Sequence, residues 1–272
     1  MAEFDEPKMQ EVPDDSEEFE LGHTDKLVGV FTSPTDTFRK IGMFPPKVVD
    51  WFLPMFIVIL VAVFAGFVKM SNPAINYEVT QKQLEMQQKS LDDAVKSGSI
   101  TQEQADQQLE ASQNIMNSPV MKVIAVLGGL IGGFIIFFIM GGIYHLFCRF
   151  ALKGDATYSY ALVGYGLASY ILILQHIIAT ILSLVTSKMI NDISIASIAG
   201  MNRAEPLGFI LTFIDPIAIW FYFILGTAFA KLYKSDNTKK YLITIFAVWI
   251  GISLLFFVLA NYIPFLKGFV GM

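Results

Sequence analysis

The chain alternates between long apolar runs that carry few charges and shorter polar segments. An apolar run of about 20 residues is the length that an α-helix needs to cross the hydrocarbon core of a bilayer. Such runs predict five membrane-spanning helices, at residues 51–70, 120–148, 158–186, 207–231 and 241–263. We therefore expect an all-α, polytopic membrane protein whose core is a five-span helical bundle.

The segment before the first apolar run has an amphipathic pattern. Over residues 26–50 the apolar side chains recur on one helical face, which is typical of helices that lie on a membrane surface. Ser33 followed by Pro34 predicts a helix start inside this segment, with Ser33 as the N-cap. Three basic side chains are expected to point toward lipid headgroups: Lys26, Arg39 and Lys40.

A hydrophilic segment, residues 71–119, separates the first two predicted spans. Its first half is rich in Gln, Lys, Glu and Leu, which are good helix formers. Thr101 and Gln104 have the spacing of a capping box, which predicts the start of a second helix. We expect an extracytoplasmic helical hairpin. Because its apolar positions are sparse, the hairpin should need a neighbouring surface to be stable.

Charge is distributed unevenly along the chain. The formal net charge is -5, yet residues 1–25 alone contain ten acidic residues and one base. A segment of this composition cannot bury enough apolar surface to fold, so we expect a disordered acidic tail. Acidic residues repel phosphate groups, so nucleic acid is not an expected partner.

The lysines and arginines of the short segments predict the orientation. With the N-terminus inside, the inner segments contain ten of these residues, whereas the short outer loop and the C-terminal tail contain three. Cytoplasmic segments are enriched in Lys and Arg. We therefore expect a cytoplasmic N-terminus and a C-terminus outside.

Four glycines in the second predicted span, Gly128, Gly129, Gly132 and Gly133, form two overlapping pairs of small residues four positions apart. Glycines at this spacing let two helix backbones approach closely. They indicate helix packing, either within the bundle or between two copies of the chain. We favour packing within the bundle, because five helices supply partners themselves, and a homo-oligomer stays possible.

Three polar residues in the predicted spans are candidates for a ligand or ion path: Asp215, His176 and Gln175. An acid inside a span is costly and by default suggests function. A second interpretation of Asp215 is that it caps a helix whose first residue is Pro216, which would leave residues 207–214 as a separate interfacial or re-entrant piece. For His176 and His145, an interhelical hydrogen bond is the simpler interpretation and the one we favour.

The chain contains no signature of catalysis. The motifs of metalloproteases, serine hydrolases and phosphate-binding loops are missing, and Cys148 is the single cysteine, so no thiolate metal cluster is expected. We predict no catalytic residue, no metal site and no cofactor, and hence a protein that is not an enzyme.

Three stretches together resemble the Yip (Ypt-interacting protein) domain family. They are residues 27–54, with LVGVFTSPTDTFRKI and then PP and WFLP, residues 154–159, GDATYS, and residues 215–231, with the pairs Ile219-Trp220 and Leu225-Gly226. The resemblance implies five spans and a cytoplasmic N-terminus, and residues 71–119 look like an insertion. It points to the prokaryotic branch and hence to the cell membrane of a prokaryote.

Two functions follow as expectations. The first is a non-enzymatic integral membrane scaffold or accessory subunit, with membrane lipid and another membrane protein or complex as partners. The second is a small transporter or channel with a polar path near Asp215 and His176.

Overall fold

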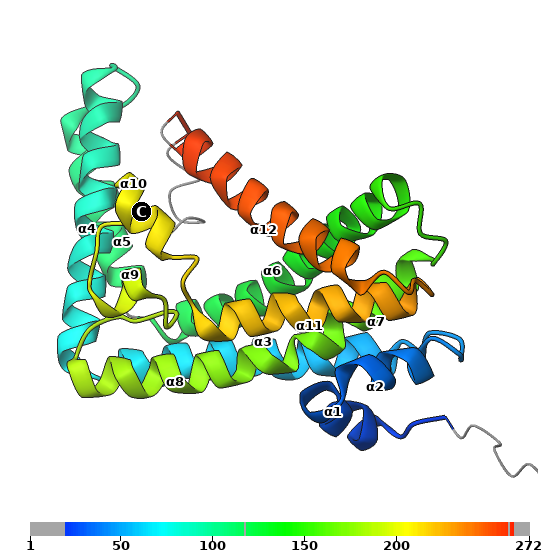
Figure 1. Ribbon diagram of the computed structural model, residues 1–272. Helices are drawn as coiled ribbons and strands as arrows, with labels where there is room; N and C mark the ends of the chain where they lie inside the picture. Colours follow the sequence, from blue (N-terminus) through cyan, green and yellow to red (C-terminus); the bar gives the residue numbers. More distant parts are fainter. Residues whose placement is uncertain (1–19, 117, 261, 264–272) are drawn as a thin grey trace, which may run out of the picture.

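A computed structural model describes residues 20–116, 118–260 and 262–263, and the regular elements in these ranges are all helices (Figure 1). They are α1 (His23–Thr32), α2 (Pro34–Ile41), α3 (Val49–Met70), α4 (Pro73–Lys96), α5 (Gln102–Met116), α6 (Pro119–Leu146), the π-helical turn η1 (Phe147–Ala151), α7 (Tyr158–Ala168), α8 (Tyr170–Thr186), α9 (Ile195–Ile198), α10 (Pro206–Leu211), α11 (Pro216–Leu232) and α12 (Thr238–Ala260). The predicted all-α class is confirmed for these ranges. Most of the acidic tail, residues 1–19, lies outside them.

Four helical stretches of the described ranges are long and apolar enough to cross a membrane. They are Val49–Met70, Val123–Ala151, Tyr158–Thr186 and Thr238–Ala260. A fifth apolar helix, α11, has only 17 residues, about 26 Å of helix. The structure therefore supports a polytopic helical membrane protein with four candidate spans, and a fifth span depends on how α11 sits in the bilayer.

The segment 207–231, predicted as one span, is two helices. The helix α10 ends at Leu211, and α11 begins at Pro216 after Asp215. A proline inside a helix removes a hydrogen bond and clashes with the carbonyl four residues earlier, so it kinks or ends the helix, and here a new helix begins at Pro216. The apolar run conceals a break that its hydropathy does not reveal.

The core of the bundle lies where α3, α7, α8 and α11 meet. The helix α11 packs against α2, α7, α8 and α12, and α3 packs against α6, α7 and α8. Large side chains from different helices are fully buried there, among them Tyr144, Leu167, Leu225 and Phe229. By contrast, only 6% of the most apolar window of Val123–Ala151 and 11% of that of α12 is buried. These two helices therefore present most of their apolar surface outward, as lipid-facing helices do.

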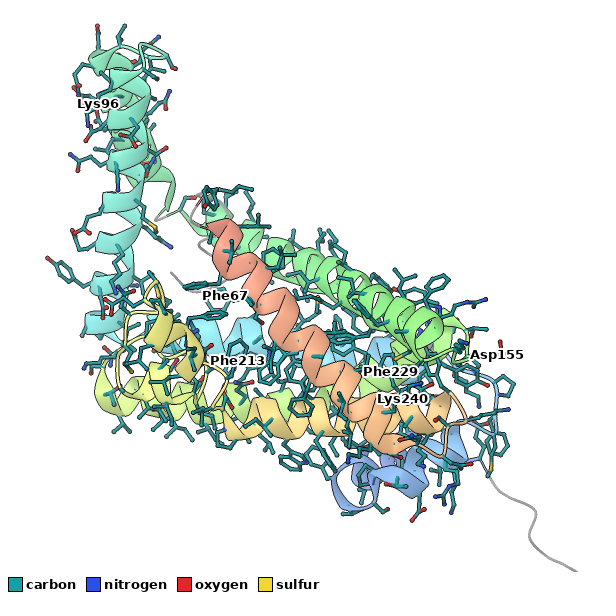
Figure 2. All side chains as sticks on the ribbon, turned by 45° about the horizontal axis from the view of Figure 1, so that its top comes forward. Phe67, Lys96, Asp155, Phe213, Phe229 and Lys240 are labelled. Atoms are coloured by element: carbon teal, nitrogen blue, oxygen red, sulfur yellow. The ribbon has the colours of Figure 1, made fainter. Side chains whose placement is uncertain are left out.

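The hydrophilic segment forms a two-helix hairpin of α4 and α5. Asn72 caps α4, because its Oδ1 accepts hydrogen bonds from the N–H groups of Ala74 and Ile75. At this break α4 turns away from the direction of α3 and α8 and runs across that end of the bundle (Figure 1), and Lys96 marks its distant tip (Figure 2). The expected capping box is confirmed, since Thr101 and Gln104 exchange two hydrogen bonds of 2.9 and 3.2 Å.

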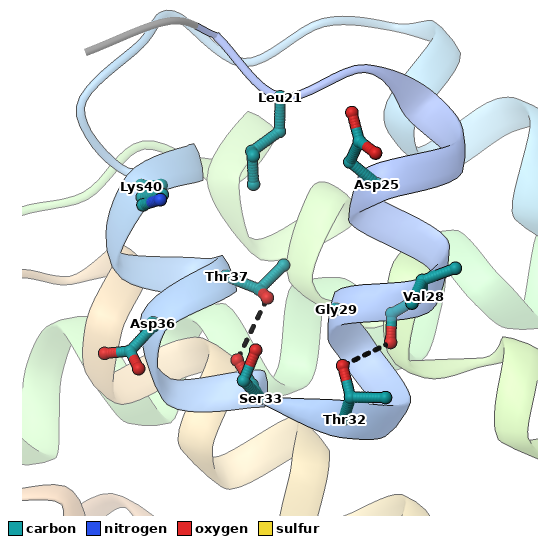
Figure 3. A pocket seen from close by; sticks show the side chains of 9 residues that line it. All are labelled: Leu21, Asp25, Val28, Gly29, Thr32, Ser33, Asp36, Thr37 and Lys40. Atoms are coloured by element: carbon teal, nitrogen blue, oxygen red, sulfur yellow. Dashed lines mark hydrogen bonds between the residues drawn. The ribbon is translucent and has the colours of Figure 1, made fainter.

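The two short helices α1 and α2 pack on the opposite end of the bundle, against α7 and α11. Ser33 occupies the N-cap position of α2 and Pro34 the first turn, but the Ser33 side chain makes no capping hydrogen bond. The Thr37 hydroxyl instead donates to the Ser33 carbonyl at 2.9 Å (Figure 3). Lys26 is also a correction: its side chain does not point toward headgroups but is buried and paired with Asp50 at 2.7 Å.

Candidate functional site

The chain between α8 and α11 folds back along α8. The side chain of Gln175, on α8, reaches Asp215 at the start of α11 with a hydrogen bond of 2.7 Å. Gln175 lies eleven residues before Thr186, the last residue of α8, a distance of about 16 Å along the helix. Residues 187–215 therefore re-enter the bundle from the hairpin end, and we call them the re-entrant segment.

Asp215 holds the inner end of the re-entrant segment. Its Oδ1 atom accepts from the backbone N–H groups of Ile217 and Ala218 at 2.9 and 3.0 Å. Its Oδ2 atom accepts from Gln175 and from the backbone N–H of Ile193 at 3.1 Å. The residue is 1% exposed. Asp215 is thus the N-cap of α11, the second of its two interpretations, and four N–H donors surround its carboxylate.

Lys69, near the end of α3, is a central part of this cluster. Its ammonium group is buried and donates to the carbonyl of Ile190 at 3.0 Å and to Oδ1 of Asn191 at 3.2 Å. The Ser183 hydroxyl on α8 also donates to the Ile190 carbonyl and accepts from its N–H. These bonds tie the start of the re-entrant segment to α3 and α8.

Asp192 organises the middle of the re-entrant segment. Its Oδ1 accepts from the N–H and hydroxyl of Ser194 and from the hydroxyl of Ser197, and its Oδ2 is paired with Arg203. Burial alone would raise the pKa of Asp192, but the hydrogen bonds from Ser194, Ser197 and Arg203 outweigh it and hold the pKa below its usual value. Asp192 is therefore ionised at neutral pH, and its carboxylate can accept the hydrogen bonds that hold the segment together.

The structure does not join His176 to this carboxylate cluster. Asp215 bonds the neighbouring Gln175, whereas no hydrogen bond of the His176 ring is found within the described ranges. His145, in the last turn of α6, shares a hydrogen bond with the Tyr233 hydroxyl. This is the hydrogen bond between helices that the simpler interpretation expected. Of the three predicted ligand-binding residues, the fold brings two together, in a contact that supports the start of a helix.

The four glycines of α6 divide between two faces. A Cβ atom on Gly129 or Gly133 would come within 3.2 or 2.8 Å of the Val63 or Ile59 side chain of α3, whereas one on Gly128 or Gly132 would meet nothing within 4 Å. One glycine pair therefore packs within the bundle, and the other lies on an open face.

A second buried polar cluster lies at the α1 end of the bundle. The Lys26 ammonium contacts Oδ2 of Asp50 at 2.7 Å, and His23 shares a hydrogen bond of 2.8 Å with the Tyr170 hydroxyl and lies 3.7 Å from Asp50. Sequence reasoning missed this cluster. The only signal was an acid at the edge of an apolar run, which does not identify its partner.

These observations define the class of the protein: an all-helical membrane protein whose buried polar groups hold its own segments in place. The match to a family model makes the class more specific, because the Yip1 domain model covers residues 28–260. The chain belongs to the Yip1 domain family. No curated protein and no solved structure matches the chain.

Proposed function

We propose that this Yip1-domain protein is a non-enzymatic scaffold or accessory subunit that binds another membrane protein through the α4–α5 hairpin. The observation that carries the proposal is how little of the hairpin is buried. Among the 24 residues of α4 only Ile75 is buried, and among the described side chains of α5 Ala105 is the buried apolar one. Two large side chains, Tyr77 and Met86, are 68% and 63% exposed.

Such a hairpin is poorly stabilised by itself. A cross-helix bond, from the Ser112 hydroxyl to Oε1 of Gln87 at 2.8 Å, supplements a sparse apolar seam. Helices without a packed apolar face are marginal in water, so a docked partner would supply the missing surface. The direction of α4, across the end of the bundle, favours a neighbour in the same membrane (Figure 1).

The polar cluster supports a structural role for the bundle itself. The four donors around the Asp215 carboxylate leave it engaged with the protein. Five hollows on the described surface are lined by residues other than Asp215, Gln175 and His176. The engagement of this carboxylate favours a framework over a conducting path.

Site-specific photocrosslinking tests the scaffold proposal. A photoreactive amino acid at position 77 or 86 should give the same crosslinked protein in native membranes. A matched probe at Ile131, which is 62% exposed on the apolar face of α6, should give lipid adducts instead. Replacement of residues 74–117 by a short Gly-Ser linker should abolish co-purification of that protein with the chain. Probes on the hairpin that capture no protein, or the same proteins as the Ile131 probe, would contradict the proposal.

A small transporter or channel is the second candidate function. It is favoured by one observation, the irregular backbone of the re-entrant segment beside α8, because such backbone in membrane proteins often lines a substrate or ion path. Substitution Asp215→Asn would then change ion or substrate flux in proteoliposomes. Unchanged flux in this variant, with the fold preserved, would remove the candidate.

The proposed setting is the cell membrane of a prokaryote, with the N-terminus in the cytoplasm. In support, the topology gathers the ten basic residues of the predicted inner segments at the α1–α2 end, where Lys240 lies (Figure 2). Single cysteines test this orientation, because the native Cys148 is buried. A membrane-impermeant maleimide should label Ser99→Cys in intact cells and Asn237→Cys only after lysis. The reverse result would overturn the orientation.

A further inference from the structure

A cationic hollow of about 310 Å³ lies at the α1–α2 end of the bundle, between the end of α2 and the end of α11. Arg39, Lys231 and Lys234 line it, together with one acid, Asp236. The hollow is separate from the hairpin and from the Asp215 cluster. Neither of the functions proposed above uses it.

Rigid parts of the fold form the hollow. Phe38 and Ile41 of α2 are buried, and α2 packs against α11. At Gly42 the helix ends come so close that an added Cβ would lie 3.4 Å from the carbonyl oxygen of Lys231. The positions of the basic residues are therefore set by two packed helices.

The charges of the hollow are poorly compensated within the protein. Arg39 contacts Asp36 at 2.8 Å, but both side chains are more than half exposed, so this pair is weak. Lys231 and Lys234 have no carboxylate within ion-pair distance in the ranges that the structure describes. Asp236 is the one acid in the lining, so the hollow has an excess of positive charge.

Helix ends explain part of this charge but not all of it. Basic residues in the last turn of a helix interact favourably with its dipole, which accounts for Arg39 and Lys231. Lys234 lies beyond α11 and has a φ of 54°, in the left-handed region where glycine is favoured. The N–H groups of Lys234 and Ser235 bond the carbonyls of Lys231 and Ala230, the pattern of a helix end that usually carries glycine. A lysine at this position places a charge in the hollow at a conformational cost.

The surroundings of the hollow favour an amphipathic ligand. Met43, which is 49% exposed, lines it beside the cations. Val48 and Val49, at the start of the candidate span α3, are also exposed. An anionic group in the hollow would therefore have apolar protein surface close by.

We propose that this hollow binds the phosphate of an anionic phospholipid headgroup, with Arg39, Lys231 and Lys234 as the binding residues. A guanidinium fork fits phosphate oxygens in a bidentate way, and the two ammonium groups add point charges. The acyl chains would lie along the exposed apolar surface of the membrane-spanning helices.

Purified full-length protein in neutral detergent provides the test. Its melting temperature is followed during titration with phosphatidylglycerol, phosphatidylcholine or inorganic phosphate. Phosphatidylglycerol should raise the melting temperature, and the other two probes should not. The double variant Lys231→Gln/Lys234→Gln should bind phosphatidylglycerol roughly tenfold more weakly, because two charge-assisted contacts are lost. The matched control, Lys239→Gln/Lys240→Gln, changes the net charge equally outside the hollow and should bind as the parent does.

Lys234→Gly separates binding from folding. It removes the charge but relieves the left-handed backbone, so the lipid-free variant should melt at or above the parent temperature and still lose affinity for phosphatidylglycerol. Equal losses in both double variants would overturn the proposal in favour of diffuse charge. An equal shift with inorganic phosphate would overturn it in favour of a free anion. A lipid effect that occurs only after deletion of residues 1–19 would overturn it in favour of the acidic segment as occupant.

Discussion

In the ranges that the structure describes, each end of the bundle buries one lysine and one aspartate, but these charges are compensated differently at the two ends. At the α1 end, Lys26 and Asp50 are 4% and 2% exposed and contact each other at 2.7 Å. At the hairpin end, Lys69 and Asp215 are 5% and 1% exposed. Lys69 donates to a backbone carbonyl and an amide oxygen, and Asp215 accepts from four N–H groups.

The difference shows two ways of keeping a charge inside a helical bundle. A directly paired charge depends on its partner, so the loss of one member leaves the other buried without compensation. A charge held by neutral dipoles has no single partner, and its loss leaves only neutral groups at hydrogen-bond distance. The same substitution should therefore have different consequences at the two ends.

The largest effect is expected for Lys26→Met. It leaves the Asp50 carboxylate buried without its ammonium partner, which should lower the free energy of unfolding by about 3–5 kcal/mol. Titration with denaturing detergent in micelles measures this value. Lys40→Met, at an exposed position of α2, is the matched control and should change it by less than about 0.5 kcal/mol. A decrease of less than about 1 kcal/mol in the free energy of unfolding for Lys26→Met would show that the Lys26–Asp50 pair does not stabilise the fold as proposed.

A smaller effect is expected for Asp215→Ala. The variant loses the cap of α11 and leaves buried N–H donors without an acceptor, at a cost of about 2–3 kcal/mol. Asp215→Asn retains one oxygen for the cap and should cost about 1 kcal/mol. Hydrogen exchange should become faster in the first turn of α11 in the alanine variant. If both variants were equally destabilised, the charge would matter more than the cap.

Lys69→Met sharpens the comparison, because it repeats the Lys26 substitution at the other end. The Ile190 carbonyl keeps the Ser183 hydroxyl as a donor at 3.1 Å, so we expect a change within about 1 kcal/mol. The same detergent titration serves as the measurement. A loss as large as that of Lys26→Met would abolish the distinction between the two ends.

The smallest effect concerns the pH dependence of the re-entrant segment. The pKa of Asp192 in the folded protein lies below its usual value, so its stabilising contribution is complete above that value and is lost as the pH falls through the folded pKa. Hydrogen-exchange protection of residues 193–203, corrected for intrinsic rates, should be flat at neutral pH and fall in acid, by at most about 1 kcal/mol. Asp192→Asn should remove this acid-dependent fall. A fall that persists in that variant would assign it to other groups.

The class of the fold followed from the length of the apolar runs, because hydrocarbon requires helices of a set length. The capping box at Thr101 and the cap at Asp215 were also predictable, since each depends on residues a few positions apart. The break before Pro216 was visible only as one of two alternatives. Hydropathy does not reveal where an apolar segment changes direction.

The two buried lysines could not be predicted, because their surroundings come from distant parts of the chain. Lys26 meets Asp50 24 residues later, and Lys69 meets the Ile190 carbonyl 121 residues later. Spacing identified the glycines of α6 as packing residues, but only the structure shows that Gly133 faces α3 and Gly132 does not. Such long-range contacts are set by the fold as a whole.

The sideways course of α4 has a consequence for the spacing of molecules in the membrane. Its 24 residues make a rod of about 36 Å. A partner held near Lys96 would stand roughly one small-domain diameter from the bundle axis, with lipid free to fill the space between them. The length of the hairpin would then set the distance between the two neighbouring proteins and keep their membrane-spanning helices apart.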